Sequence, residues 1–273
     1  MLSEISGAGG NSPFAITTTN LTTGNNLVTL SGTAPVQVQS IQINGVEYPL
    51  TWTSVSAWTV TVPVSSPTNL FNIAGFDLYG NALTNYAGTV TVRYTGLAPS
   101  PLGAVVLNEI MYNPAIPDAT YVELFNASAT ASFDLSNWRV NGLGYTFPPG
   151  SIITNRQFLV LAKNRSAFIS AYGTGAIAFD EFSGSLQTDG ETLTLLMPGT
   201  GSGQEITVDK VRYAAAAPWP KTDPGVSLQL IDPVDTVQAE WHAYVRRLKA
   251  ALAGSDLEFF KKAKGRTAGD GNR

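Results

Sequence analysis

Short runs of alternating apolar and polar residues, separated by Gly, Pro, Asn and Asp, recur along most of the chain. Examples are residues 27–33, 58–62, 89–94 and 158–162. A period of two predicts β-strands that bury one face and expose the other, and such short, evenly spaced runs are typical of sandwiches. The pattern therefore predicts an all-β chain.

One turn is specified by its own residues. Asn44-Gly45 lies between two alternating runs, and both residues accept a positive φ at little cost. This dipeptide predicts a tight hairpin that pairs residues 41–43 with residues 46–48. We expect Trp52 and Trp58, in the next two runs, to fill the core of the same unit.

Two segments break the alternation. Residues 168–172 follow Ala162-Lys163-Asn164-Arg165 and precede Gly173, which predicts one short helix ending at that glycine. Residues 238–264 place apolar residues at helical spacing and basic residues on the opposite face, which predicts an amphipathic helix and a second short one.

The domain organisation follows from length and composition. The 273 residues suffice for two domains of roughly 100 to 150 residues each, and the Pro/Gly-rich stretch from Gly96 to Gly103 suits neither a helix nor a central strand. We expect a flexible leader over residues 1–24, a first sandwich over 25–95, a linker over 96–103, a second sandwich over 104–235 and a basic helical or disordered tail over 236–273.

Particular motifs carry a resemblance to known domains. Leu30-Ser31-Gly32-Thr33-Ala34 and Gly75-Phe76-Asp77-Leu78-Tyr79-Gly80-Asn81 make the first unit resemble bacterial immunoglobulin-like domains. From residue 104 to residue 233 a longer series of motifs resembles the bacterial lamin-tail domain. Its stretches, in register, are residues 105–114, 121–126, 133–140, 145–153, 158–162, 190–195, 208–213, 217–220 and 227–233.

The resemblance implies two consecutive β-sandwiches, immunoglobulin-like and lamin-tail immunoglobulin-like, with a short helical tail. Members of these families occur in large exported bacterial surface proteins, so an extracellular or cell-surface location is implied. It implies a topology and no reaction. The chain starts Met1-Leu2-Ser3-Glu4, without the features of a signal peptide, so we expect any export signal to lie upstream of this fragment.

Charge separates the tail from the rest. Only 13% of the residues are charged; residues 1–235 hold 8 Lys+Arg against 16 Asp+Glu, whereas residues 236–273 hold 8 against 4. An acidic body argues against nucleic acid as a partner, and no apolar run reaches the ~20 residues of a membrane span. The abrupt change raises the question of whether residues 236–273 are native. The oligomeric state stays open.

Few residues suit catalysis. The chain has no cysteine and one histidine, His242, in the tail, which excludes thiolate chemistry and a Ser-His-Asp triad within the sandwiches. Carboxylates remain. Glu109 and Glu123 fall in motif strands that we expect to be neighbours, and Asp180 and Glu181 lie near loops. A strand-borne Glu that accepts hydrogen bonds from the backbone or from Arg139 is the structural alternative, which we favour.

Two binding chemistries stay open. Oxygen ligands are abundant, so one structural calcium site is conceivable at Asp77, Asn81, Asp134 or Asp189, with simple Asx-turns as the alternative. Trp219, Tyr145 and Tyr172 could offer aromatic faces to a sugar, with core packing as the alternative.

The favoured function is a non-catalytic binding or scaffolding segment of an exported bacterial surface protein, contacting glycan or protein partners. The rival is a calcium-assisted extracellular hydrolase of a glycoside, ester or lactone that uses Glu109, Glu123, Asp180 or Glu181. A third hypothesis is assembly, in which the basic tail helix docks on the acidic sandwich of a neighbouring copy.

Overall fold

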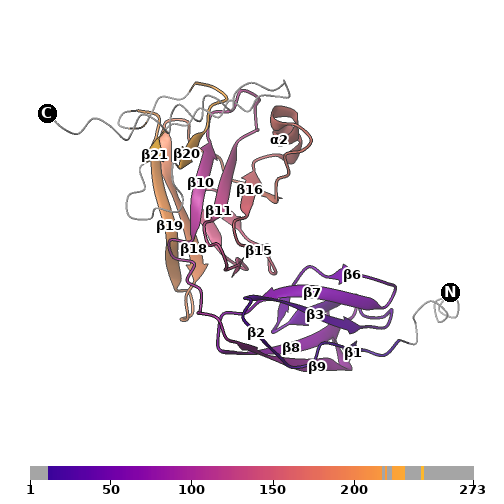
Figure 1. Cartoon of the computed structure of the whole chain (residues 1–273). Coiled ribbons are helices and arrows are strands. Elements are labelled where there is room, and N and C mark those ends of the chain that lie inside the picture. The colour runs from indigo at the N-terminus through magenta and orange to yellow at the C-terminus, as the bar shows by residue number, and fades with distance from the viewer. Residues whose placement is uncertain (1–11, 217–218, 220–222, 231–240, 243–273) are drawn as a thin grey trace, which may run out of the picture.

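The computed structural model describes residues 12–216, 219, 223–230 and 241–242. These residues form two β-sandwiches joined by a short connection, with one helix in the second (Figure 1). The all-β fold expected from the alternating pattern is confirmed.

Two sheets form the first sandwich. One sheet has the strand order β1-β3-β7-β6 and the other β2-β9-β8-β4-β5. The strands are β1 (Ala15–Ile16), β2 (Leu21–Thr23), β3 (Leu27–Thr33), β4 (Ser40–Ile43), β5 (Val46–Glu47), β6 (Thr51–Trp52), β7 (Ala57–Pro63), β8 (Thr68–Phe76) and β9 (Ala82–Tyr94).

Alternation along β3 and β7 builds the core of this sandwich. Val28 and Leu30 point inward from β3, and Trp58 points inward from the neighbouring strand β7. Gly32 pairs with Trp58, and a Cβ at residue 32 would lie 2.4 Å from the indole Cζ2 and 2.4 Å from the Ala15 carbonyl oxygen. The indole therefore occupies the space that a side chain at position 32 would need.

The first sandwich begins earlier than expected. We expected a flexible leader up to residue 24, but β1 pairs with β3 and β2 pairs in parallel with β9, joining Leu21 to Val92. Phe14, Ile16 and Leu21 pack against the core. Their spacing among Thr and Asn residues is too irregular to reveal this in the sequence.

The second sandwich has a six-stranded sheet, β17-β16-β11-β10-β20-β21, a four-stranded sheet, β14-β13-β18-β19, and the small pair β12-β15. Its strands are β10 (Val105–Met111), β11 (Tyr121–Asn126), β12 (Phe133–Asp134), β13 (Arg139–Asn141), β14 (Tyr145–Thr146), β15 (Ile152–Ile153), β16 (Phe158–Ala162), β17 (Asp180–Glu181), β18 (Gly190–Pro198), β19 (Glu205–Ala214), β20 (Leu228–Leu230) and β21 (Trp241–His242).

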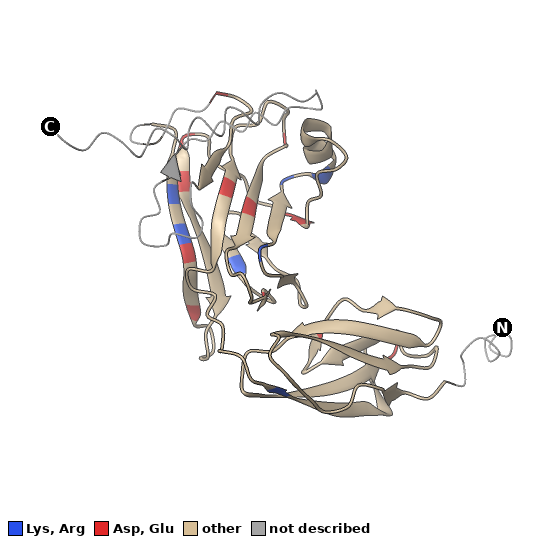
Figure 2. Ribbon diagram, viewed as in Figure 1, with Lys and Arg blue, Asp and Glu red and all other residues tan. Residues whose placement is uncertain are grey.

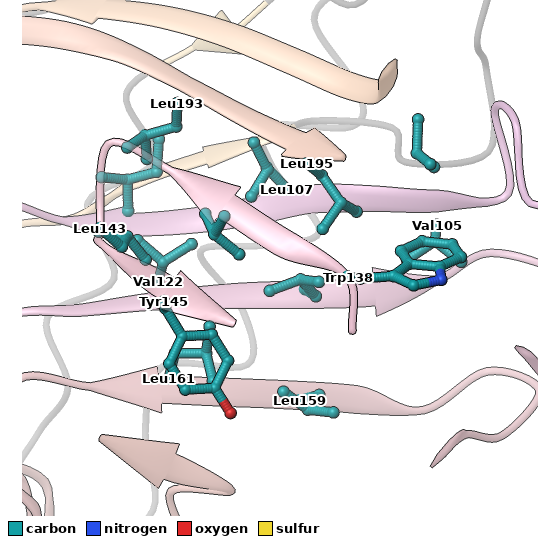
Figure 3. Close-up of a cluster of buried hydrophobic side chains, with 14 of the residues drawn as sticks. Val105, Leu107, Val122, Trp138, Leu143, Tyr145, Leu159, Leu161, Leu193 and Leu195 are labelled. Atoms are coloured by element: carbon teal, nitrogen blue, oxygen red, sulfur yellow. The ribbon is translucent and has the colours of Figure 1, made fainter. Parts of the chain in front are cut away.

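Strand β10 is buried at all of its positions. Its inward side chains, Val105 and Leu107 among them, share the main core with residues of the four-stranded sheet such as Leu193 and Leu195 (Figure 3). Its outward Val106 and Met111 belong to smaller clusters on the other face of the sheet. A central strand covered on both faces explains why five of the seven residues at 105–111 are apolar.

A side chain also joins the two sheets. The register of β10 against β11 shifts between Leu107 and Glu109, and the Leu107 N–H donates to the Asp209 Oδ2 of β19 at 2.7 Å. Burial, the largest influence, raises the pKa of Asp209, although hydrogen bonds from the Leu107 and Lys210 amides oppose the rise.

Two local predictions are confirmed. Asn44 and Gly45 have φ of 53° and 78° and connect β4 to β5, with Ile43 opposite Val46. The helix α2 (Arg165–Tyr172) begins after Asn164, whose side chain accepts the Ala167 N–H, and ends at Gly173.

The tail differs from the prediction where it is described. Of the helix expected over residues 238–264, the structure describes only Trp241–His242, which form β21 against β20, with His242 opposite Gln229. Pairing with a sheet edge replaces helical hydrogen bonds there. The rest of that helix, and the assembly hypothesis that depends on it, lie outside the described residues. No helix within the described ranges is long and apolar enough to cross a membrane.

Gly32→Ala tests the packing of Trp58. We expect the free energy of unfolding to fall by about 1–3 kcal/mol, because the new methyl group meets the indole and the Ala15 carbonyl. Urea denaturation followed by tryptophan fluorescence measures the loss. Gly24→Ala is the control, since a Cβ there has only an ordinary contact of 3.7 Å with Thr95. Equal stability of the two variants would contradict the packing described.

Candidate functional site

The two sandwiches meet through a buried side chain. Asn26, just before β3, donates from Nδ2 to the Ser132 carbonyl oxygen at 2.7 Å, and its Oδ1 accepts the Ser132 N–H at 3.0 Å. Both residues are buried, and β12 lies against β7 beside them. One amide therefore satisfies both backbone groups of a residue in the other sandwich.

A second contact lies beside the first. The Tyr48 hydroxyl donates to Asp134 Oδ2, while the Ser136 N–H donates to Asp134 Oδ1 at 2.8 Å. Burial, and then the hydrogen bond to Asp134, raise the pKa of Tyr48, which keeps the phenol protonated as a donor. The carboxylate is thus held by groups from both sandwiches.

Gly150 completes the junction. Its φ is 79°, and a Cβ there would lie 2.6 Å from Pro49 Cδ, 2.7 Å from Tyr48 Cα and 2.9 Å from the Glu47 carbonyl oxygen. Its N–H donates to Ser136 Oγ at 2.8 Å. The loop before β15 can approach the first sandwich closely only because residue 150 has no side chain.

A cleft of about 490 Å³ opens beside this contact. We call it the junction cleft. The first sandwich supplies most of its wall and Pro149 of the second supplies the rest, so its shape depends on the junction. Its lining residues are Gln39, Ser40, Ile41, Glu47, Tyr48, Pro49, Leu50, Trp52 and Pro149.

The residues that form this cleft could not be recognised from the sequence. We expected Trp52 in the core with Trp58, but its side chain is 42% exposed and lines the cleft, whereas Trp58 is fully buried. Strand β6 is an edge strand of two residues, so it does not bury alternate positions as β7 does. The sequence signal was the Tyr48-Pro49-Leu50 interruption between two strands.

The aromatic residues proposed as a sugar platform do not line the junction cleft. They belong to different parts of the second sandwich. Tyr145, in β14, is 6% exposed and donates from its hydroxyl to Asp180 Oδ2 at 2.9 Å. Tyr172, in α2, donates to the Ala119 carbonyl oxygen at 3.0 Å. Trp219 is partly buried and packs against the main core of the second sandwich.

Glu109 and Glu123 are direct neighbours, as expected, because β10 and β11 pair them in register. Glu109 is 1% exposed, and its Oε1 accepts the Tyr121 hydroxyl at 2.6 Å and the Ser227 hydroxyl at 2.5 Å. Burial, followed by the nearby charge of Glu109, raises the pKa of Tyr121. This tyrosine therefore remains a donor to the carboxylate.

Glu123 is partly buried, and its Oε1 accepts a hydrogen bond from Asn108 Nδ2 at 2.8 Å. The expected partner Arg139 lies in β13 of the other sheet and pairs instead with Glu205, with 2.8 Å between Arg139 Nε and Glu205 Oε1. The Arg139 side chain therefore pairs with a residue of β19 in its own four-stranded sheet, and not with Glu109 or Glu123.

Asp180 and Glu181 form β17 and hold the start of α2. Asp180 Oδ1 lies 3.2 Å from Arg165 Nη2, and Glu181 Oε1 accepts the Arg165 N–H at 2.6 Å. With Tyr145 on its other oxygen, Asp180 links β14, β17 and α2. Asp180 and Glu181 are not next to Glu109 in the sheet, because the strands β16 and β11 lie between β17 and β10.

The proposed calcium ligands are dispersed. Asp77 accepts hydrogen bonds from the Tyr79 and Asn81 N–H groups at 2.8 and 2.9 Å. These hydrogen bonds lower the pKa of Asp77, and those from Asn81 have the largest effect. Asp134 lies at the junction and Asp189 is exposed before β18. Within the described ranges, no three acidic or histidine side chains are grouped as a metal site would require.

Charge is unevenly distributed between the sandwiches. Between residues 12 and 95 only Glu47, Asp77 and Arg93 are charged, whereas the second sandwich has charged positions on several strands (Figure 2). The junction cleft thus contains one formal charge, that of Glu47.

Asn26→Ala tests the junction. The variant leaves the buried N–H and C=O of Ser132 without their partner, so we expect a loss of about 1–3 kcal/mol of unfolding free energy. Small-angle scattering should show a wider range of interdomain orientations. Asn25→Ala, at an exposed neighbouring position, should leave both measurements unchanged. Wild-type scattering from Asn26→Ala would contradict a rigid junction.

Tyr121→Phe tests the structural role of Glu109. The ring contacts with Phe168 and Tyr172 are kept, but one donor to a buried carboxylate is lost. We expect the free energy of unfolding to fall by about 1–3 kcal/mol in urea denaturation. Tyr79→Phe, which removes the hydroxyl of a residue that is 86% exposed, should have no effect. If both variants match the wild type, this hydrogen bond does not stabilise the fold.

Similarity to known proteins is limited in extent. No curated protein matches the chain. One similar solved structure is the SGBP-B protein of the Bacteroides ovatus mixed-linkage glucan utilization locus, in complex with a mixed-linkage heptasaccharide. It has 13% identity and a TM-score of 0.19, and the match covers 71% of this chain and 42% of that one. Another is the BSP domain of a biofilm associated protein, with 16% identity, a TM-score of 0.22 and coverage of 76% and 30%. The chain thus spans less than half of either.

A family match coincides with the second unit of the fold. The matched segment begins before β10 and ends just after β19, so it contains both main sheets except the strands β20 and β21. The motif series identified in the sequence falls largely within it. Residues 98–215, the greater part of the second sandwich, match the family model of the Lamin Tail Domain.

Proposed function

We propose that the chain is a non-catalytic binding or scaffolding segment of an exported bacterial surface protein, with an immunoglobulin-like domain preceding the lamin-tail domain. Its partners are glycans or proteins outside the cell. The observation that carries this proposal is the junction, where Asn26 and Ser132 exchange two buried hydrogen bonds. Such a contact holds two sandwiches in one orientation and presents their surfaces together.

The placement of the acidic residues supports a structural role for them. Glu109 is buried and accepts two hydroxyl donors, and Asp180 holds Arg165 and Tyr145. A general acid or base must reach the proton that it transfers, within about 2.6–3.2 Å or through one water. Carboxylates that already accept hydrogen bonds or pair with an arginine suit the stabilisation of strands better than this task.

Envelope polymers test the proposal against the hydrolase alternative. The full chain is incubated with peptidoglycan sacculi and with neutral cell-surface polysaccharide, with calcium in one arm and a chelator in the other. We expect retention of the protein on at least one polymer in both arms, without release of reducing ends into the supernatant.

Two outcomes would contradict the proposal. Release of reducing ends that is abolished in the Glu109→Gln, Glu123→Gln double variant would establish the hydrolase. Failure of every polymer, and of envelope proteins in a parallel pull-down, to retain the chain would refute a binding role.

A further inference from the structure

We propose that the junction cleft is a binding site for a neutral oligosaccharide, with Trp52 as the residue against which a sugar ring packs. The inference rests on the proposed binding role and adds a site and a ligand class to it. Its basis is the combination of an open hollow, an exposed aromatic side chain, polar groups around it and walls that belong to two sandwiches.

The size and place of the cleft suit a small ligand. Its volume of about 490 Å³ lies within the range of ligand sites, roughly 300–1,000 Å³, and such sites occur preferentially where domains meet. Most of the lining side chains in the hollow belong to residues 39–52, which fold back as β4, β5 and β6. Pro149 adds the part that the second sandwich supplies.

The lining chemistry is that of sugar recognition. A pyranose ring has apolar C–H faces and a rim of hydroxyl groups. Trp52, Pro49 and Leu50 supply apolar surface, and an aromatic face can pack against such a ring. The Gln39 amide and the Ser40 hydroxyl can both donate to and accept from sugar hydroxyls, and the Glu47 carboxylate can accept from them.

Charge selects a neutral ligand. Glu47 is the one charged residue in the lining, and no Lys or Arg side chain lines the cleft. A uronic acid, a sulfated sugar or a phosphate would bring a second negative charge to this carboxylate without a cation to offset it. A neutral sugar hydroxyl, in contrast, can donate to the carboxylate, and such charge-assisted hydrogen bonds are strong.

The junction fixes the cleft before any ligand arrives. The Tyr48 hydroxyl is tied to Asp134, and Gly150 packs on the backbone of residues 47–49. Pro149, next to this contact, is itself restricted in φ. A wall held in place in this way loses little conformational entropy on binding, which favours affinity.

The test uses the full chain and defined probes: cellohexaose, laminarihexaose and mannohexaose as neutral oligosaccharides, and oligogalacturonate as the acidic comparator. Titration calorimetry gives the affinity, and the NMR shift of the Trp52 indole N–H reports contact. We expect at least one neutral probe to bind and to shift this signal, and oligogalacturonate to bind at least tenfold more weakly.

Variants locate the site. Trp52→Ala should weaken binding of the same probe by about tenfold or more, and Gln39→Ala should weaken it to a smaller extent. Tyr79→Ala removes an exposed aromatic ring outside the cleft and should leave affinity unchanged. Trp52→Phe keeps an aromatic face and should retain part of the affinity, which guards against loss of folding in the alanine variant.

The outcomes separate this inference from the proposed function. If the chain is retained on polymer and Trp52→Ala, folded by circular dichroism, is retained equally, the cleft inference is overturned while the binding role stands. The cleft inference also fails if no neutral probe binds, or if oligogalacturonate binds as tightly. If neither polymer nor protein is retained, both proposals fail.

Discussion

Ser132 lies at the contact between two sandwiches with its backbone N–H and C=O out of reach of solvent, and the Asn26 amide satisfies both. An unpaired buried backbone group costs a large part of a domain's net stability, so this exchange allows the two surfaces to close on each other. The hydrogen bond from Tyr48 to Asp134 and the close approach of Gly150 then become possible on the same side. The junction cleft, with walls from both sandwiches, follows from these contacts. The bidentate Asn26 amide, the Tyr48–Asp134 hydrogen bond and the packing of Gly150 together connect the two sandwiches.

The sequence revealed features that depend on neighbours along the chain. Alternation gave the strands β3 and β7, Asn44-Gly45 gave the hairpin between β4 and β5, and Gly173 gave the end of α2. Each rests on a local preference that a few residues suffice to express. The pairing of Glu109 with Glu123 could also be predicted, because the motif resemblance supplied the order of the strands.

What could not be predicted depends on residues far apart in the chain. Asn26 and Ser132 are separated by 106 positions, and nothing in an Asn-Asn-Leu sequence before a strand marks one asparagine as buried. We expect Trp52 in the core with Trp58, but an edge strand of two residues leaves it 42% exposed at a cleft. The exposed Arg139 forms its ion pair with Glu205, on the far side of β18, and not with Glu109 or Glu123. The burial of these residues and their contacts depend on how the sheets are arranged in space. A single sequence does not reveal that arrangement.

The parallel pairing of β2 with β9 has a consequence for the order in which the chain can fold. Leu21 of β2 pairs with Val92 of β9, so nearly the whole first sandwich must be synthesised before β2 finds its partner. Contacts between such distant residues slow folding, because a long loop must be closed before they form. During synthesis on a ribosome, β2 can pair only after β9 has emerged, and Asn26 can bond to Ser132 only later still. The contact between the two sandwiches can therefore form only after the beginning of the second has been synthesised.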